Sequence, residues 1–196
     1  MRRLMLQAAM NLMQSGITPS VTEVAEAAEV SRATAYRYFP SQAALVQAVV
    51  DEALGPILKW QSADPDPRNR IKDLIETAMP RIDEFEATFK AALKLSLDQW
   101  AQRQAGTLGN EPRLTRGHRV GLLKDVTAPL QGKVSPAKRE RLEQALSLVF
   151  GVETLVVLKD IWGLSAAEAQ TVAAWAATAL VDATTGETNT KIVESG

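Results

Sequence analysis

Apolar residues recur every three or four positions along most of the chain, and this spacing restricts the fold more than any other feature of the sequence. Residues 4–13 and residues 71–89 show the pattern most clearly. Such spacing places the apolar side chains on one face of a helix, which must then pack against a neighbour. No segment alternates apolar and polar residues in the way that a half-buried strand does. The sequence therefore predicts an all-α fold.

Capping signals predict four helices in about the first 55 residues. Ser20 lies three residues before Glu23, which is the spacing of a capping box, and predicts the start of the second helix. Ser31 is positioned to cap the third helix, which Pro40 ends, and Ser41 is positioned to cap the fourth. The second and third helices are therefore short and joined by a tight turn.

The middle of the chain is divided by two connections rich in proline or glycine, at residues 62–67 and 105–112. Between them, the helical spacing predicts two helices with a bend near Pro80 or Glu86. The sequence then predicts an amphipathic helix within residues 114–130.

Two strongly apolar helices are predicted near the end of the chain. The first spans about residues 137–161, follows a cap at Ser135, and has Glu153 as the one charge in its most apolar part. The second follows a capping box formed by Ser165 and Glu168. Because a helix without a polar face must be covered on more than one side, this pair predicts a subunit interface. A core within one chain is the alternative.

The composition argues against an enzyme. The 196-residue chain has no cysteine and one histidine, which excludes disulfides, thiolate metal sites and cysteine nucleophiles. It contains no glycine-rich phosphate loop, no serine-elbow motif and no metal-ligand pair at helical spacing. We therefore expect no catalytic residues, no metal and no cofactor.

The composition also predicts a cytoplasmic protein without a membrane partner. The most apolar stretch, residues 166–183, contains acids and is mostly alanine, so it falls short of a membrane span. The first residues contain no export signal. A formal net charge of −1 restricts any binding of nucleic acid to a local basic face.

Residues 31–41 provide such a face, because they include Arg32 and Arg37 and no acid. They also carry hydroxyl and aromatic side chains, on a helix that follows a tight turn. A helix of that kind fits the major groove of DNA, where its exposed side chains reach the base edges. A solvated helix face is the alternative interpretation of the two arginines.

Residues 20–45 resemble the helix-turn-helix signature of TetR-family regulators. The residues that carry the resemblance are Val24-Ala25, Val30-Ser31, Thr34, Tyr36, Tyr38-Phe39 and the Pro40-Ser41 step before Leu45. Core, cap and contact positions all fall in register, which makes the motif specific. The resemblance implies an all-α protein with an N-terminal three-helix helix-turn-helix domain and a C-terminal helical bundle with a two-helix dimerisation face.

The resemblance also implies which residues contact DNA. Those that correspond to base-facing positions are Arg32, Ala33, Thr34 and Arg37. Those that correspond to phosphate-holding positions are Ser20, Thr22, Thr34, Tyr36 and Tyr38. Of these, Arg32 is suited to the edge of a guanine.

Two positions depart from the family pattern. Glu29 stands in the turn where the family commonly has glycine, and a left-handed backbone there costs a residue with a side chain about 1 kcal/mol. Its carboxylate also predicts weaker DNA binding. Gln42 stands where a basic residue often follows the Pro-Ser step.

The rest of the chain corresponds to the family's effector-binding and dimerisation region. The predicted dimer interface consists of Leu146, Val149, Phe150, Val156, Val172, Trp175, Ala176 and Leu180. The candidate lining of an effector pocket is Met79, Phe85, Phe89, Trp100 and His118. Ordinary core and surface positions are the alternative for each member of the second set.

These inferences predict a helix-turn-helix domain at residues 1–50, an effector-binding and dimerisation domain at 51–188, and a polar tail at 189–196. The predicted protein is a TetR-type, DNA-binding transcriptional repressor. It forms a homodimer that a small-molecule effector releases from a palindromic operator. The alternative is a helical ligand-binding or adaptor protein that has lost specific DNA binding.

Overall fold

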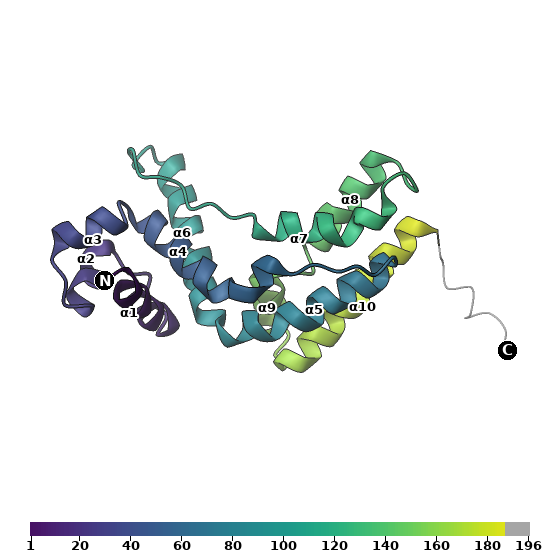
Figure 1. Ribbon diagram of the computed structural model, residues 1–196, viewed down its shortest axis with the longest axis horizontal. Helices are drawn as coiled ribbons and strands as arrows, with labels where there is room; N and C mark the ends of the chain where they lie inside the picture. Colours follow the sequence, from purple (N-terminus) through teal and green to yellow (C-terminus); the bar gives the residue numbers. More distant parts are fainter. Residues whose placement is uncertain (187–196) are drawn as a thin grey trace. The chain divides into compact units, whose positions relative to one another are not determined.

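The computed structural model describes residues 1–186 and is helical throughout, with no strand among these residues (Figure 1). The predicted tail at 189–196 lies outside the described residues. The α-helices are α1 (Arg2–Gln14), α2 (Val21–Ala27), α3 (Arg32–Tyr38), α4 (Gln42–Leu54), α5 (Pro67–Glu84), α6 (Glu86–Gln104), α7 (His118–Thr127), α8 (Pro136–Leu146), α9 (Val152–Leu155) and α10 (Ala166–Thr185). Shorter turns are η1 (Gly55–Lys59), η2 (Ala128–Leu130) and the π-helical η3 (Val156–Ile161). The all-α prediction is confirmed.

The chain forms two compact units. The first unit combines residues 1–55 with 84–116, and the second combines residues 56–83 with the chain from Gly117 onward. The first unit thus contains α6 in addition to the four N-terminal helices. The predicted division at residue 50 stays a prediction.

The first unit is built on the apolar stripe of α1, which packs against α2, α4 and α6. Met5, Ala9 and Met13 lie on this stripe and are buried in the shared core. Because α4 and α6 also pack on each other, α1, α4 and α6 form a three-helix support. The pair α2 and α3 packs together beside it (Figure 1).

Local hydrogen bonds start these helices where the sequence predicts. The Ser20 hydroxyl accepts from the amide of Glu23 at 3.2 Å, and the Glu23 carboxylate accepts from the amide of Ser20 at 2.7 Å. Ser31 caps α3, and Ser41 caps α4. The predicted capping box and both caps are confirmed.

The predicted break between the two middle helices is confirmed at its second position. Helix α5 ends at Glu84 and α6 begins at Glu86, whereas Pro80 lies within α5.

In the second unit, a side-chain hydrogen bond connects the end of η1 to α5. The indole of Trp60, the residue after η1, donates to the Asp73 carboxylate at 2.7 Å.

The single long helix predicted at 137–161 is wrong. Helix α8 ends at Leu146, and α9 begins at Val152 after Gly151, whose φ of 119° is rare for any residue with a side chain. The guanidinium of Arg119 on α7 donates to the carbonyls of Ser147 and Phe150, both at 3.0 Å, and pairs with the carboxylate of Glu153. This contact gives partners to carbonyls that leave the helix, so the break is stabilised from a distant part of the chain.

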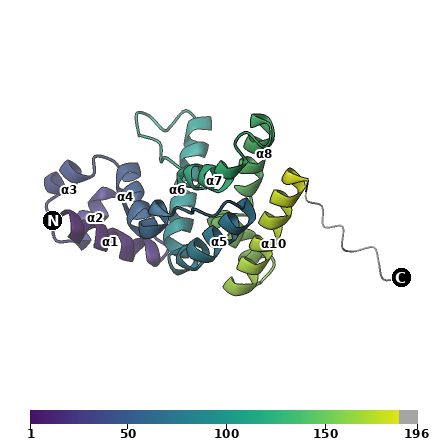
Figure 2. The same ribbon diagram turned by 45° about the vertical axis from the view of Figure 1, so that its right-hand side comes forward.

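The last helix follows its sequence signals closely. Ser165 and Glu168 form the predicted capping box, and Gly186 ends α10 in the left-handed conformation with φ 82°. The inner face of α10 consists of Ala169, Ala173, Ala177 and Val181. These small side chains allow α10 to pack on α8 and α9, and the two views of Figures 1 and 2 show α8 and α10 side by side.

Candidate DNA interface

Helix α3 is held by a narrow seam and exposes most of its surface. Ala35 and Phe39 are buried, whereas Arg32, Tyr36 and Arg37 are exposed. The other predicted base-contact positions follow the same pattern, with Ala33 exposed and Thr34 half-buried, and the phosphate candidate Tyr38 is exposed. The side chains that the sequence assigns to DNA therefore lie mostly on the open face of α3. That they contact DNA remains a proposal.

The turn between α2 and α3 is fixed by the backbone. The amide of Val30 donates to the carbonyl of Ala25 at 2.9 Å, and the amide of Glu29 donates to that of Glu26 at 3.1 Å. This pair of bonds is the Schellman motif, which requires a left-handed residue after the helix. Glu29 occupies that position with φ 54° and is the one non-glycine residue with positive φ among the described residues.

The start of α3 combines a helix cap with a hydroxyl pair. The Ser31 hydroxyl accepts from the amide of Thr34 at 3.2 Å and lies 2.9 Å from the hydroxyl of Thr34. Thr34 is thereby oriented by Ser31 and keeps the remaining hydrogen-bonding capacity of its hydroxyl for another group.

Ser20 and Thr22, at the start of α2, are half-buried. The amide of Ser20 already donates to the carboxylate of Glu23, so this amide is engaged within the capping box. The same hydrogen bond is the main reason that the pKa of Glu23 lies below its usual value, with the Ser20 hydroxyl as the second cause. A carboxylate thus stands beside Ser20 and Thr22, which are two of the five residues that the resemblance assigns to phosphate.

Two cations lie against aromatic rings at the end of α3. The guanidinium carbon of Arg37 is 5.6 Å from the centre of the Tyr38 ring, and that of Arg2 is 5.7 Å from the centre of the Phe39 ring. Both distances suit cation–π attraction. Sequence reasoning overlooked Arg2, because it evaluated this residue only as part of an export signal.

Gln42 replaces the usual basic residue and has a structural role of its own. Its side-chain amide donates to the carbonyls of Thr18 at 3.2 Å and Pro19 at 3.1 Å. The start of α4 is thereby tied to the loop that precedes α2. Gln42 braces the helix-turn-helix and adds no positive charge to it.

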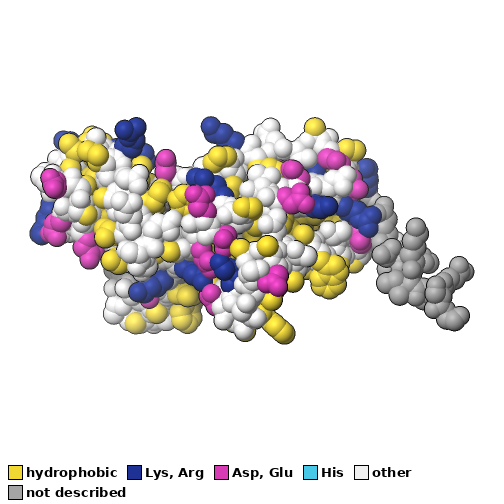
Figure 3. Space-filling view, turned by 90° about the horizontal axis from the view of Figure 1, so that it is seen from below, with side chains coloured by type: hydrophobic (Ala, Val, Ile, Leu, Met, Phe, Trp, Pro, Cys, Tyr) yellow, Lys and Arg dark blue, Asp and Glu magenta, His cyan; other side chains and the backbone are white. Residues whose placement is uncertain are grey.

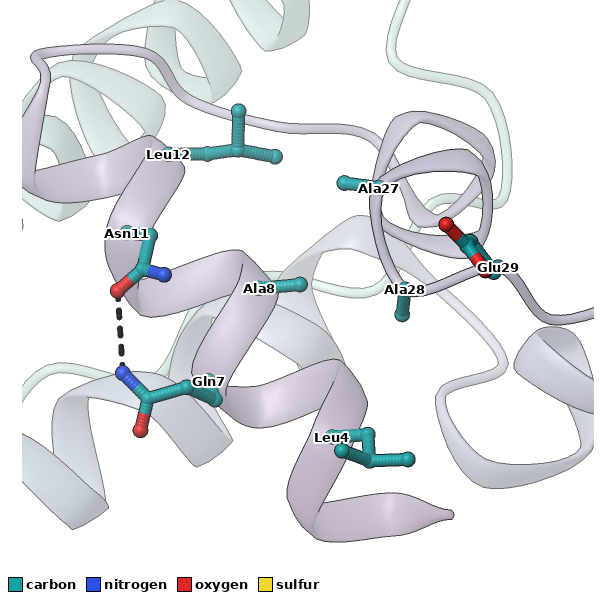
Figure 4. Close-up of a pocket in the computed structure, with 8 residues that line it drawn as sticks. All are labelled: Leu4, Gln7, Ala8, Asn11, Leu12, Ala27, Ala28 and Glu29. Atoms are coloured by element: carbon teal, nitrogen blue, oxygen red, sulfur yellow. Dashed lines mark hydrogen bonds between the residues drawn. The ribbon is translucent and has the colours of Figure 1, made fainter.

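A hollow of about 450 Å³ lies between α1 and the end of α2 (Figure 4). Its lining is Leu4, Gln7, Ala8, Asn11, Leu12, Ala27, Ala28 and Glu29. Gln7 donates to Asn11 at 3.0 Å across one turn of α1. None of the five residues predicted to line an effector pocket belongs to this hollow.

Those five residues are divided between the two units. Phe85, Phe89 and Trp100 belong to the first unit, and Met79 and His118 belong to the second. Phe89 and Met79 are buried, whereas Trp100 and His118 are exposed. No group of three or more potential metal-ligating residues occurs in the described part of the chain.

The predicted dimer residues divide into buried and accessible sets within the second unit. Leu146 and Phe150 are buried in the protomer. Val149, Val156, Ala176 and Leu180 are half-buried, and Val172 and Trp175 are exposed. Other exposed apolar residues in the same C-terminal part include Leu148, Val157, Ile161 and Trp162.

Comparisons with known proteins identify this arrangement. The sequence profile described as "Bacterial regulatory proteins, tetR family" matches residues 5–49, which span α1 to α4. A TetR transcriptional regulator from Rhodococcus sp. RHA1 has a similar structure, with a TM-score of 0.56 and 20% identity over 92% of this chain and 94% of that one. A search of curated protein sequences gives no significant match. No helix in residues 1–186 is long and apolar enough to cross a membrane. The profile match at residues 5–49 and the similar fold support the resemblance to TetR-family regulators that the sequence predicts.

Proposed function

We propose that the chain is a homodimeric repressor that acts in the cytoplasm, binds a palindromic operator through α3, and is released by a small-molecule effector. The observation that carries this proposal is the open face of α3, which exposes two arginines and two tyrosines over a seam of Ala35 and Phe39. Phosphates and base edges suit such donors.

The C-terminal part of the second unit supports the dimer. Trp162 and Trp175 are each 72% exposed, and Ile161 is 73% exposed. Hydrophobic side chains also reach the surface between charged ones on the face drawn in Figure 3. Large apolar side chains exposed on η3, at its C-cap and on α10 favour a protein partner, and in a symmetric dimer the same surface covers itself.

A dimer also meets the geometric demand of a palindromic site. Two copies of α3 must reach half-sites about 34 Å apart, or one turn of DNA. A single α3 of seven residues, Arg32–Tyr38, reads one half-site only.

The packing of α6 supports regulation by a ligand. Helix α6 packs on both α1 and α4, and the Thr18 hydroxyl lies 3.4 Å from the carbonyl of Ala91 on α6. A ligand that displaces α6 therefore acts directly on the helices that hold the helix-turn-helix. Ligand and operator affinities are then reciprocally coupled, by about 1–3 kcal/mol in typical cases.

The test is a titration of a selected DNA duplex at several salt concentrations. We expect affinity to fall steeply with added salt, because binding releases counterions from phosphates. Arg32→Ala and Tyr36→Ala should each weaken binding while the dimer stays intact. Arg141→Ala, at an exposed position of α8, is the control and should bind as the wild type does.

A specific set of observations favours a second function, that of an adaptor or ligand-binding protein without specific DNA binding. Glu23, Glu26 and Glu29 place three acids on α2 and its turn, Gln42 adds no charge, and the net charge is −1. A folded dimer that binds all duplexes equally weakly would favour this alternative over the repressor.

A further inference from the structure

Glu26 forms an ion pair with the first residue of α3. Its carboxylate lies 2.9 Å from Nη2 of Arg32, and the two side chains are 63% and 68% exposed. Arg32 is the arginine that the sequence assigns to a base edge. The ion pair therefore joins an acid on α2 to the arginine of α3 that is expected to contact a base.

The turn brings the two residues together. Glu26 lies in the last turn of α2, and the carbonyl of the same residue accepts from the amide of Glu29 in the Schellman motif. Because Glu29 is held in the left-handed conformation, the chain reverses directly into the Ser31 cap of α3. The position of Glu26 relative to Arg32 thus follows from backbone geometry at both ends of the turn.

An arginine held in this way differs from a free one in two respects. A free arginine loses much rotamer freedom when it binds, so an arginine that is already restrained loses less at the moment of DNA contact. The guanidinium also carries several N–H donors in a planar fork, and the pair engages Nη2. Donors therefore remain for the acceptors of a guanine edge.

The carboxylate also discriminates between the two kinds of acceptor that DNA offers. Phosphate is an anion and is repelled by Glu26, whereas O6 and N7 of guanine are neutral acceptors. Glu26 thereby disfavours the contacts with the backbone that every sequence provides, and leaves the contact with guanine comparatively unaffected.

We propose that Glu26 is a specificity-determining residue that positions Arg32 for guanine and reduces binding to DNA of any other sequence. This inference rests on the proposed function, since it requires that α3 reads an operator. Glu26 acts through Arg32 and is a positioning residue; it makes no base contact of its own.

The test compares Glu26→Gln with Glu29→Gln, which removes one negative charge three residues further along the same turn. Binding is measured on the selected duplex, on duplexes with each base pair of a half-site replaced, and on a random-sequence duplex. We expect both variants to bind random DNA about twofold more tightly, because each lacks one negative charge near phosphate. Only Glu26→Gln should lose preference for guanine at one position of each half-site, by about fivefold, which is part of what a bidentate arginine–guanine pair provides.

The double variant of Glu26→Gln with Arg32→Ala shows whether the two residues act together. If Glu26 works through Arg32, the replacement of Glu26 changes no base preference once the guanidinium is absent. The inference is overturned if Glu26→Gln keeps the full preference for guanine, or if its effect persists without Arg32. A wild-type protein that selects no sequence overturns the proposed function itself, and that result is known before any variant is tested.

Discussion

The exposed surface of α3 and the exposed surface of η3 and α10 are both unusually rich in large side chains, but they suit opposite kinds of partner. On α3, the aromatic residues Tyr36 and Tyr38 carry hydroxyls and stand beside arginines. Ile161 on η3, Trp162 at its C-cap and Trp175 on α10 are exposed without a hydroxyl, and the lysine of η3, Lys159, is paired with Asp83. The first surface suits a wet, charged ligand such as DNA, and the second suits a dry contact with protein. Exposure alone therefore does not distinguish the two surfaces; the polar atoms on the exposed side chains do.

The largest effect of a single substitution is expected at Trp175, on the exposed apolar surface of α10. We expect Trp175→Glu to dissociate the proposed dimer. Trp175 is exposed in the single chain but would be buried in the dimer interface, so the variant would bury a charge in each copy. A loss of about 4 kcal/mol for the two copies, or about a thousandfold in Kd, is the expected scale. Sedimentation equilibrium over a range of concentrations measures it.

Trp100→Glu is the matched control for this prediction. Trp100 is 56% exposed on α6, in the first unit. We expect its replacement to leave the dimer unchanged. An unaltered association constant in Trp175→Glu would show that the apolar surface of α10 is not the subunit interface.

Arg119 on α7 contacts the break between α8 and α9. We expect Arg119→Ala to lower the free energy of unfolding by about 2 kcal/mol, because two carbonyls and a half-buried carboxylate lose their donor. Urea unfolding measures the loss. Arg139→Ala removes only a pair with Glu143 at 3.5 Å within one helix and should cost less than about 0.5 kcal/mol. Equal stability of the two variants would mean that Arg119 does not hold the break between α8 and α9.

Two substitutions at Glu29, in the turn before α3, separate the effect of backbone strain from the effect of charge. Glu29→Gly should raise the free energy of unfolding by about 1 kcal/mol, because glycine adopts a φ of 54° without a steric penalty. Glu29→Gln keeps the strain and should leave stability near that of the wild type. If glycine destabilises the protein, the left-handed conformation is not strained at this position.

The smallest expected effect concerns Glu23. Its pKa is lowered in the folded protein, so the ionised form stabilises the fold above the usual pKa of a glutamate, and this contribution is lost as the pH falls through the lowered value. Glu23→Gln should therefore be less stable at neutral pH, by about 0.5 kcal/mol for a charge at a helix start. The difference from the wild type should disappear once the pH lies below the lowered pKa of Glu23. Thermal unfolding across this pH range checks both signs, and a difference that persists in acid would contradict the assignment.

Features set by neighbouring residues could be predicted from the sequence. The caps at Ser20, Ser31 and Ser165 all form as expected, because each involves a hydroxyl and an amide three residues apart. The left-handed turn at Glu29 is equally local. These features define the helix-turn-helix, and most of the candidate DNA-binding side chains accordingly lie on its open face.

Features set by distant residues could not be predicted. The break in the region 137–161 depends on Arg119, which is 28 residues before Ser147 in the chain. The glycine at position 151 was a local signal for the break, because glycine tolerates the positive φ that the chain adopts there. The apolar pattern on both sides of Gly151 nevertheless continues through the break and favours one long helix. The ion pair of Glu26 and Arg32 could have been predicted from the sequence, because the tight turn between α2 and α3 was already expected. The effector candidates rested on residue type alone, and the fold divides them between two units.

Selection of duplexes from a random-sequence pool by the wild-type protein is the most direct test of the proposal that α3 reads an operator. We expect enrichment of one palindromic sequence with half-sites about one helical turn apart. We also expect that a parallel selection with Arg32→Ala loses the base preference at one position of each half-site. Recovery of no common sequence by a folded, dimeric protein would contradict the assignment of α3 as an operator-reading helix.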